Sequence, residues 1–224
     1  AAVSDSYELT VTNTNDAPTV TSAISDGSIA EDASYSLNAA AAFTDVDSSD
    51  TLTYTMSGAP STLSISSGTI SGTPLNADVG AHTIIVTATD GSNAAVSDTF
   101  ILTVTNTNDA PTVANAIADA STAEDAAYTL SLSNVFTDVD TGDSCTYSMS
   151  GAPSTLSLSS GTISGTPINA NVGSHTIVVT CTDGSSAAVS DSYDLTITNV
   201  NDSPAYITTG TTSATEDTAY AYVV

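Results

Sequence analysis

The chain has 224 residues with 25 aspartates and glutamates, two histidines and neither lysine nor arginine, so its formal net charge is −25. Nucleic-acid binding depends on basic side chains that neutralise phosphates and release counterions, so this composition excludes nucleic acid as a partner. An anionic membrane surface is excluded for the same reason. No apolar run approaches the roughly 18 residues needed to cross a bilayer, so no membrane insertion is expected in this segment.

The sequence is a tandem repeat. The segment VTNTNDAPTV at 11–20 recurs at 104–113, and the related ITNVNDSPAY follows at 197–206, so both shifts are 93 residues. Self-similarity at a fixed period marks a repeat architecture, and it divides this chain into four parts. We predict the last strand of a preceding repeat at 1–15, complete repeats at 16–108 and 109–201, and the opening strands of a following repeat at 202–224.

Each repeat has the pattern of an all-β sandwich, because turn residues recur at short intervals and apolar residues alternate between them. Ile84, Val86 and Ala88, for example, alternate with polar or outward positions in one stretch. In the first repeat the predicted strands lie near 19–24, 34–40, 51–57, 62–66, 69–73, 81–89 and 95–106. The predicted fold is therefore all-β, with tandem seven-stranded Greek-key β-sandwiches stacked head to tail.

The acidic residues cluster in loops instead of being scattered over the strands. Because consecutive strands alternate in direction, the loops at Glu31 and Asp109 belong to one end of the first sandwich, and those at Asp45 and Asp90 to the other. Head-to-tail stacking then brings loops of two repeats together. The side chains expected at that junction are Glu31, Asn106, Asn108 and Asp109 from the first repeat and Asp138, Asp140 and Asp183 from the second. The second repeat carries its own copy of the first group, namely Glu124, Asn199, Asn201 and Asp202.

Such a junction offers roughly six to eight oxygen ligands, which is the coordination that Ca²⁺ prefers. Zinc and copper would favour His or Cys, which the junction lacks. Two carboxylates about 5 Å apart repel each other by about 0.8 kcal/mol even in bulk water, so several together require a divalent cation between them. We therefore predict bound Ca²⁺; the alternative interpretation is that these carboxylates belong to ordinary solvated turns.

The motifs resemble those of bacterial cadherin-like domains, related to the dystroglycan-type cadherin-like and putative Ig tandem repeats of large surface adhesins. The resemblance rests on NxNDxP at the linker, DVD after the second strand, ATDG or CTDG before the last strand, and the segment SGTISGTP. In cadherins the corresponding motifs bind calcium between repeats and stiffen the rod. By this match, the ligands at the first linker are Asp45, Asp47 and Asp90 facing Asn13, Asn15 and Asp16. The linker is shorter than the animal pattern, with Asn13 and Asn106 where an acid is usual, which implies only one or two ions per junction.

The two cysteines, Cys145 and Cys181, both belong to the second repeat, and the first repeat has Leu52 and Ala88 at those places. One interpretation is a pair of buried free thiols. Because both are present in one repeat and both absent from the other, we favour a disulfide across the core, as expected for an extracellular protein. The two histidines occupy the same position in both repeats and are interpreted as strand residues.

We predict a structural and adhesive role and no catalysis. The chain has no GxSxG nucleophile motif, and sandwich ends offer no cleft for a pair of catalytic carboxylates. The favoured hypothesis is a calcium-stiffened stalk of a secreted or cell-surface adhesin, whose partners are neighbouring repeats of the same chain or of identical chains. The alternative is a subunit of an extracellular filament assembled by strand exchange. A repeat that itself recognises a carbohydrate or protein is a third possibility, and the adhesive target is not predicted.

Overall fold

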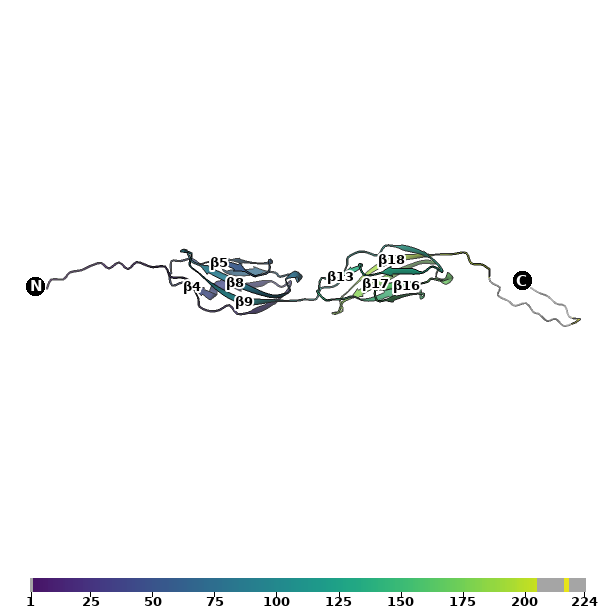
Figure 1. Ribbon diagram of the computed structural model, residues 1–224, viewed down its shortest axis with the longest axis horizontal. Coiled ribbons are helices and arrows are strands. Elements are labelled where there is room, and N and C mark those ends of the chain that lie inside the picture. The colour runs from purple at the N-terminus through teal and green to yellow at the C-terminus, as the bar shows by residue number, and fades with distance from the viewer. Residues whose placement is uncertain (1, 205–215, 218–224) are drawn as a thin grey trace. The chain divides into compact units, whose positions relative to one another are not determined.

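The computed structural model describes residues 2–204 and 216–217, and these form two compact units (Figure 1). The first contains residues 2–109 together with Asp138–Asp143, and the second contains Ala110–Thr137 together with the described residues from Ser144 onward. Residues 2–18 form no strand, so the last strand of a preceding repeat stays a prediction. The opening strands predicted at 202–224 lie mostly outside the described residues.

The first unit is a two-layered sandwich. Within residues 2–109 its strands are β1 (Thr19–Val20), β2 (Gly27–Ala30), β3 (Tyr35–Asn38), β4 (Phe43–Thr44), β5 (Thr53–Ser57), β6 (Leu63–Ser66), β7 (Thr69–Gly72), β8 (Gly80–Thr89) and β9 (Ala95–Thr105). One layer is a four-stranded sheet in the order β2-β9-β8-β5, the other is a three-stranded sheet in the order β3-β7-β6, and β1 pairs with β4. Two short 3-10 helices, η1 (Ala39–Ala42) and η2 (Asn76–Asp78), precede β4 and β8.

The second unit repeats this arrangement. Its strands are β10 (Thr112–Val113), β11 (Ala120–Ala123), β12 (Tyr128–Ser131), β13 (Phe136–Thr137), β14 (Thr146–Ser150), β15 (Leu156–Ser159), β16 (Thr162–Gly165), β17 (Gly173–Thr182) and β18 (Ala188–Thr198), with the 3-10 helix η3 (Asn169–Asn171) before β17. The sheet orders are β11-β18-β17-β14 and β12-β16-β15, and β10 pairs with β13. Within the part of the chain that the structure describes, no helix is long and apolar enough to cross a membrane.

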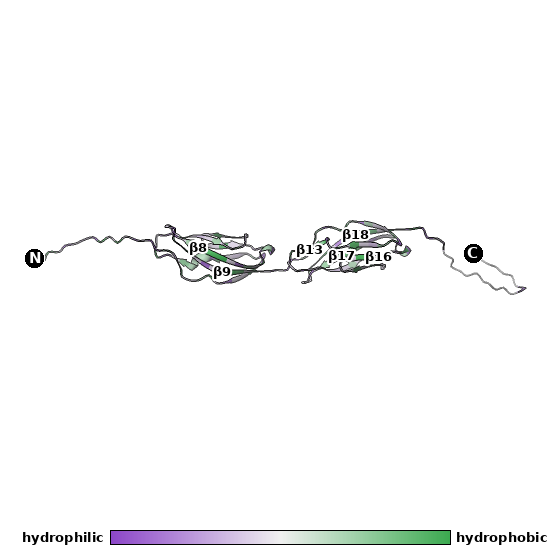
Figure 2. Ribbon diagram, viewed as in Figure 1, coloured by the Kyte–Doolittle hydropathy of each residue, from purple (hydrophilic) through white to green (hydrophobic). Residues whose placement is uncertain are grey.

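The core of each unit follows from the two-residue period of its strands. Ile84, Val86 and Ala88 on β8 are fully buried, and Ile177 and Val179 take the same places on β17. Figure 2 shows these hydrophobic stretches in green along β8 and β17. The predicted all-β tandem sandwich is therefore confirmed, with one separate core in each unit.

The start of each unit differs from the prediction. The strand expected at 19–24 ends at Val20, and a second strand, β2, follows at Gly27 and pairs in parallel with β9. Between them the backbone N–H of Ile24 donates a hydrogen bond to Oδ2 of Asp98 at 2.6 Å, and this contact holds the segment as it crosses between sheets. The sequence GSIA of β2 has only one large apolar residue, so its strand pattern is weak. The two-residue strand β4 was not predicted either.

A disulfide joins Cys145 and Cys181, with 5.1 Å between their Cα atoms. The predicted pairing of the two cysteines is present, but the bond does not cross the core from one layer to the other. Cys181 lies on β17, and Cys145 directly precedes β14, which is the neighbour of β17 in the same sheet. The bond therefore links two adjacent strands of one sheet, because Cys181 pairs with Tyr147 and Cys145 lies two residues before Tyr147.

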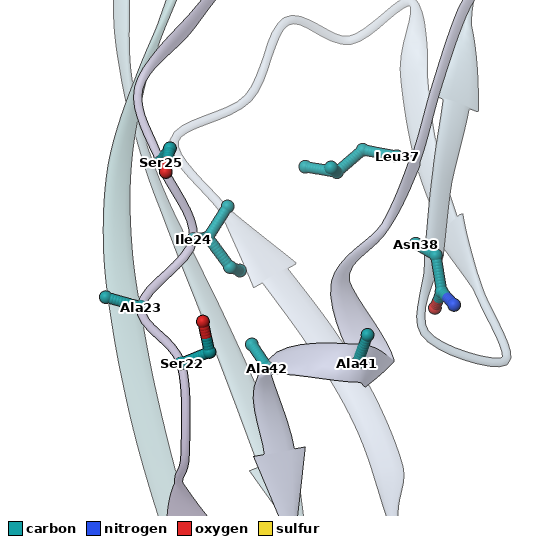
Figure 3. A pocket seen from close by; sticks show the side chains of 8 residues that line it. All are labelled: Ser22, Ala23, Ile24, Ser25, Leu37, Asn38, Ala41 and Ala42. Carbon is teal, nitrogen blue, oxygen red and sulfur yellow. The ribbon is translucent and has the colours of Figure 1, made fainter.

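The first unit has an open hollow of about 290 Å³ beside η1, lined by segment 22–25 and by Leu37, Asn38, Ala41 and Ala42 (Figure 3). In the second unit the position of Ala42 is taken by Val135, which is buried in the core. The first unit therefore lacks the two additional methyl groups that Val135 buries at the equivalent place.

We predict that Ala42→Val stabilises the first unit by about 1 kcal/mol, because it buries apolar surface in this hollow with the side chain that the second repeat has at the same place. Hydrogen exchange of peptides from β8 and β9 under increasing denaturant measures the effect on this unit alone. The matched change Val135→Ala is expected to destabilise the second unit by about 2 kcal/mol. Faster exchange of β8 in Ala42→Val would show that the hollow cannot accept the larger side chain.

Candidate metal centres

Glu31 lies just after β2, where its backbone N–H donates a hydrogen bond to the carbonyl of Thr105, the last residue of β9, at 2.9 Å. The side chain is only 2% exposed. Its Oε1 accepts a hydrogen bond from the N–H of Thr107 at 2.9 Å, but its Oε2 is buried without any hydrogen-bond partner. The fold thus buries a carboxylate and satisfies only one of its two oxygens.

Two further carboxylates of the first compact unit lie beside Glu31. Asp140 belongs to the loop Asp138–Asp143, which packs with this unit, and its Oδ2 accepts a hydrogen bond from the N–H of Asp109 at 2.8 Å. Glu31, Asp109 and Asp140 each offer an oxygen within 4.8 Å of the others. Two oxygens that bind one calcium ion at about 2.4 Å are at most about 4.8 Å apart, so this spacing fits a shared ion.

The loop itself forms a second group, in which Asp138, Asp140 and Asp143 offer oxygens within the same distance of one another. The N–H of Asp140 donates to Oδ1 of Asp138 at 3.0 Å, which is a turn within the loop. Oδ2 of Asp138 is buried without a hydrogen-bond partner, like Oε2 of Glu31. Through Asp140 this second group shares a residue with the group around Glu31.

The other end of the first unit holds a third group, formed by Asp45, Asp50 and Asp90. It lies at the opposite end because Asp90 follows β8, which runs antiparallel to β9. Burial and the charges of Asp45, Asp47 and Asp90 raise the pKa of Asp50. Oδ2 of Asp45 and Oδ2 of Asp50 are both buried without hydrogen-bond partners.

Residues 13–16 of the N-terminal linker donate hydrogen bonds to carboxylates at this end of the unit. Asn13 donates its side-chain amide to Oδ1 of Asp47 and Asn15 donates to Oδ2 of Asp90, both at 2.9 Å. The backbone N–H of Asp16 donates to Oδ2 of Asp47 at 2.7 Å. The hydrogen bond from Asn15, followed by those from the backbone of the loop after β8, lowers the pKa of Asp90 below its usual range.

The second unit repeats the arrangement around Glu124, which is 2% exposed. Its Oε1 accepts hydrogen bonds from the N–H of Val200 at 2.8 Å and from the side chain of Asn169 at 3.4 Å, and its Oε2 is buried without a partner. Asn169 also donates to Oδ2 of Asp202 at 3.5 Å. The same unsatisfied glutamate oxygen thus recurs in both units.

These buried carboxylates have no basic side chain to pair with, because the whole chain lacks lysine and arginine. The effective penalty for burying an unpaired charge is several kcal/mol. The histidines do not serve as partners: Nε2 of His82 contacts the carbonyl of Asp78 and Nε2 of His175 contacts that of Asn171. An acidic oxygen-only donor set with unsatisfied oxygens is the chemistry of a hard divalent cation.

The structure brings some of the predicted residues together and leaves others apart. Glu31, Asp109 and Asp140 come together at one end of the first unit, and Asp45, Asp47, Asp90, Asn13, Asn15 and Asp16 at the other. Asp183 is buried in the second unit, where its Oδ1 accepts hydrogen bonds from the N–H groups of Ser185 and Ala187. The exposed linker amides are those of Asn106, Asn108, Asn199 and Asn201.

Sequence reasoning missed Asn76, whose side chain donates to Oδ1 of Asp140 at 2.9 Å. Asn76 and Asn106 line a hollow of about 540 Å³ with Ala77, Val79 and Thr141. The signal for this residue was present, because an Asn stands at the same place in both repeats, in TPLNADVG and TPINANVG. Asp50 and Asp143 were not among the predicted ligands, and both belong to the acidic groups.

The sequence matches a family model in two consecutive stretches, residues 17–105 and 110–198, and the family is described as "Putative Ig domain". The chain belongs to this family. Its two matched Ig domains coincide with the two sandwiches, and the predicted membership in cadherin-like and Ig-like tandem repeats is confirmed.

Curated relatives of this tandem Ig-domain chain include staphylococcal adhesins. It is 36% identical, over 157 residues and 68% of its length, to the "Serine-rich adhesin for platelets" of Staphylococcus aureus strain MRSA252, of which it spans only 11%. The corresponding protein of strain MSSA476 is also 36% identical over 68% of the chain, which spans 7% of it. These relatives are not enzymes, in agreement with the non-catalytic prediction.

Two solved structures share the fold. Mouse cadherin-23 EC22–24 has a TM-score of 0.58 and 19% identity, over 82% of this chain and 65% of that one. Drosophila N-cadherin EC1–4 has a TM-score of 0.51 and 18% identity, over 83% of this chain and 50% of that one. At this identity the likeness establishes the fold alone.

The hydrogen bonds of Asp78 in η2 predict how the stability of the first unit depends on pH. The N–H of Leu75 and the hydroxyl of Thr62 donate to Oδ2 of Asp78 at 3.0 and 2.7 Å, and these hydrogen bonds lower its pKa. A lowered folded-state pKa contributes stability above the unfolded value, about 3.9, which is lost as the pH falls through the folded value. The second unit has Asn171 at this place, with the same two hydrogen bonds from Thr155 and Ile168.

We therefore predict that Asp78→Asn leaves the stability of the first unit nearly unchanged at pH 7 and makes it less sensitive to acid below about pH 4. The measurement is hydrogen exchange of β8 peptides from pH 7 to pH 3, with variant and natural chain compared at each pH. The converse change, Asn171→Asp, should add acid sensitivity to β17. Identical pH profiles for natural and variant chains would contradict the assigned role of Asp78.

Proposed function

We propose that this chain is part of an extracellular adhesin stalk in which Ca²⁺ ions bind at the linkers of the Ig-domain repeats and stiffen them. One observation carries the proposal: Glu31 and Glu124 are buried, each with one oxygen that no donor satisfies, in a chain without lysine or arginine. A cation shared with neighbouring acidic residues removes this unfavourable burial.

Protonation does not satisfy these oxygens equally well. A protonated Glu31 would place a hydroxyl at or near Oε2, and that hydroxyl would need an acceptor, whereas Oε2 has no hydrogen-bond partner of either kind. Calcium accepts six to eight oxygens in flexible geometry, while Mg²⁺ demands a near-ideal octahedron at shorter distances. The loose grouping of carboxylates and amides around Glu31 suits calcium better.

The amide side chains complete the ligand set. Asn15 and Asn76 now direct their NH₂ groups at carboxylates, Asp90 and Asp140 respectively. A half-turn about the last side-chain bond would exchange each NH₂ for the amide oxygen, which is an acceptor and a calcium ligand. Without the ion, the amide NH₂ groups would reduce the repulsion between the carboxylates. With the ion present, the amide oxygens would coordinate it.

An ion at Glu31 would tie together three separate chain segments. Glu31 follows β2, Asp109 lies in the linker after β9, and Asp140 lies in the loop Asp138–Asp143. Without the ion these carboxylates repel one another, and with it they share one charge centre. Calcium modules of the extracellular space commonly bind at about 10⁻⁴–10⁻³ M, so the linkers would stiffen in calcium-rich surroundings.

The relatives support the surface role. The staphylococcal proteins are named as adhesins, and this chain spans about a tenth or less of their length, as expected for one piece of a longer array. The partners of these repeats would then be their neighbours in the same chain or in identical chains.

The calcium proposal predicts that millimolar Ca²⁺ raises the melting temperature of the chain and that EDTA reverses the change. At ten times the dissociation constant, one ion stabilises the folded state by about 1.4 kcal/mol. Glu31→Gln with Asp140→Asn should remove the part of this response that belongs to the first unit. The variant should also lose any calcium-dependent extension of the particle in small-angle scattering.

The matched control is Asp5→Asn with Glu8→Gln, which removes the same two charges from exposed positions outside every acidic group. It should keep the full calcium response. If the control and the Glu31 and Asp140 variant respond to calcium as the natural chain does, these carboxylates hold no ion. The acidic groups would then be solvated turns.

A second candidate function, the strand-exchange filament, is favoured by residues 2–12. Their sequence AVSDSYELTVT closely matches AVSDSYDLTIT of β18. In β18 the residues Tyr193 and Leu195 are buried in the core, whereas their counterparts Tyr7 and Leu9 are 88% and 76% exposed. Segment 2–12 therefore carries the core-facing pattern of a last strand and could complete a sandwich supplied by another repeat.

Strand exchange predicts that the chain associates as its concentration rises and that Leu9→Asp abolishes the association, because Leu9 would enter a core. Light scattering across a concentration series measures this. Thr10→Asp changes the neighbouring, outward-facing position with the same added charge and should have a smaller effect. A chain that stays monomeric at all concentrations would contradict strand exchange between identical chains. The adhesin stalk would then remain as the proposed function.

A further inference from the structure

In each unit the first strand of the four-stranded sheet lies beside the last strand and runs parallel to it. In the first unit β2 pairs with β9 from Gly27 opposite Leu102 to Ala30 opposite Thr105. In the second unit β11 pairs with β18 from Ala120 opposite Leu195 to Ala123 opposite Thr198. Tension on the two chain ends of a unit pulls such a pair in opposite directions along the strands, so their hydrogen bonds are loaded together instead of one at a time.

Along the sequence, both cysteines of the disulfide lie between the two strands of the parallel pair in the second unit. Cys145 and Cys181 are 36 residues apart, and both lie between β11 and β18. The first unit has Leu52 and Ala88 at these places and no covalent bond. When the parallel pair separates, the first unit can therefore extend along its whole length. In the second unit the disulfide keeps the segment between the two cysteines from extending.

The bond is also shielded while the sandwich is closed. Cys181 is 0% exposed and lies in the core cluster with Ile177 and Val179, and Cys145 packs, partly buried, against the same cluster. A thiol in solution must reach a sulfur atom along the axis of the S–S bond before it can exchange. For the fully buried sulfur of Cys181, that approach requires the core of the second unit to open first.

We propose that the Cys145–Cys181 disulfide limits the extension of the second unit under tension and that thiols release this limit only after force has opened the sandwich. The inference rests on the proposed stalk role, since a stalk is a part that bears load. The two nearly identical repeats would then extend differently under tension, the first completely and the second only in part. The limit is a property of the covalent connectivity and does not involve calcium.

The release step is thiol–disulfide exchange with a small-molecule thiol such as glutathione. Its thiolate attacks one cysteine sulfur, forms a mixed disulfide and displaces the other cysteine as a thiolate, which takes up a proton. A second thiolate then attacks the mixed disulfide. Two cysteine thiols are formed in the protein, and two thiols of the reductant are oxidised to one disulfide.

Single-molecule force spectroscopy of the full chain, held by its two ends, tests the proposal. Without reductant the two unfolding steps should differ in length by about 120 Å, because 36 residues at about 3.4 Å each remain behind the bond. With a thiol present, the shorter step should be followed, at constant force, by a further step of about 120 Å. The rate of that further step should rise with thiol concentration.

Two variants provide matched controls. Cys145→Leu with Cys181→Ala copies the first repeat and should give two equal long steps with or without thiol. Leu52→Cys with Ala88→Cys copies the second repeat and should give two short steps, each extended by thiol. If the latter variant fails to fold, the natural chain with and without thiol decides the question.

Equal steps in the natural chain without reductant would overturn the proposal. So would full reduction of the closed chain by thiol before any force is applied, since the bond would then not be shielded. Neither outcome concerns calcium binding, because the step lengths depend on the disulfide alone. A chain with unequal steps and no calcium response would keep this inference and lose only the calcium-stiffened stalk.

Discussion

The absence of any lysine or arginine is the constraint on which the rest of this structure depends. With 25 acidic residues in the chain, no buried carboxylate can be neutralised by a basic side chain, and the burial of an isolated charge costs several kcal/mol. Each buried oxygen must therefore find an N–H donor or an ion. Most of them find donors in the backbone, as Asp90 does in the loop after β8, where its Oδ1 accepts from Ser92 and Ala94.

The exceptions gather where the chain enters and leaves a sandwich. Oε2 of Glu31 and Oε2 of Glu124 are buried without partners at equivalent places in the two units, which argues against an accident of one loop. The parallel pairing of β2 with β9 positions Glu31, because it brings the turn after β2 against Thr105 and Thr107. The same pairing sets β2 parallel to β9, which is the arrangement on which the proposed response to tension depends.

Much of this was predictable from the sequence. The 93-residue repeat and the two-residue alternation of apolar residues predicted the tandem sandwiches. The alternating direction of the strands predicted that Asp45 and Glu31 lie at opposite ends of the first sandwich. The split of the first strand was not predictable, because GSIA in β2 is stabilised by its parallel partner and not by its own pattern. The place of the disulfide within one sheet depends on which strands are neighbours, and the contact of Asn76 with Asp140 depends on how a loop folds. Periodicity along a chain carries neither kind of information.

Equilibrium dialysis of the natural chain against radioactive Ca²⁺, with physiological salt and excess Mg²⁺, tests the central claim most directly. We expect saturable binding with a half-point of about 10⁻⁴–10⁻³ M, reduced by the replacement of Glu31 and Glu124 with glutamine. Such a result would assign the unsatisfied oxygens to an ion. Weak binding that does not saturate, or that is unchanged when both glutamates are replaced, would contradict the claim that these buried carboxylates hold calcium.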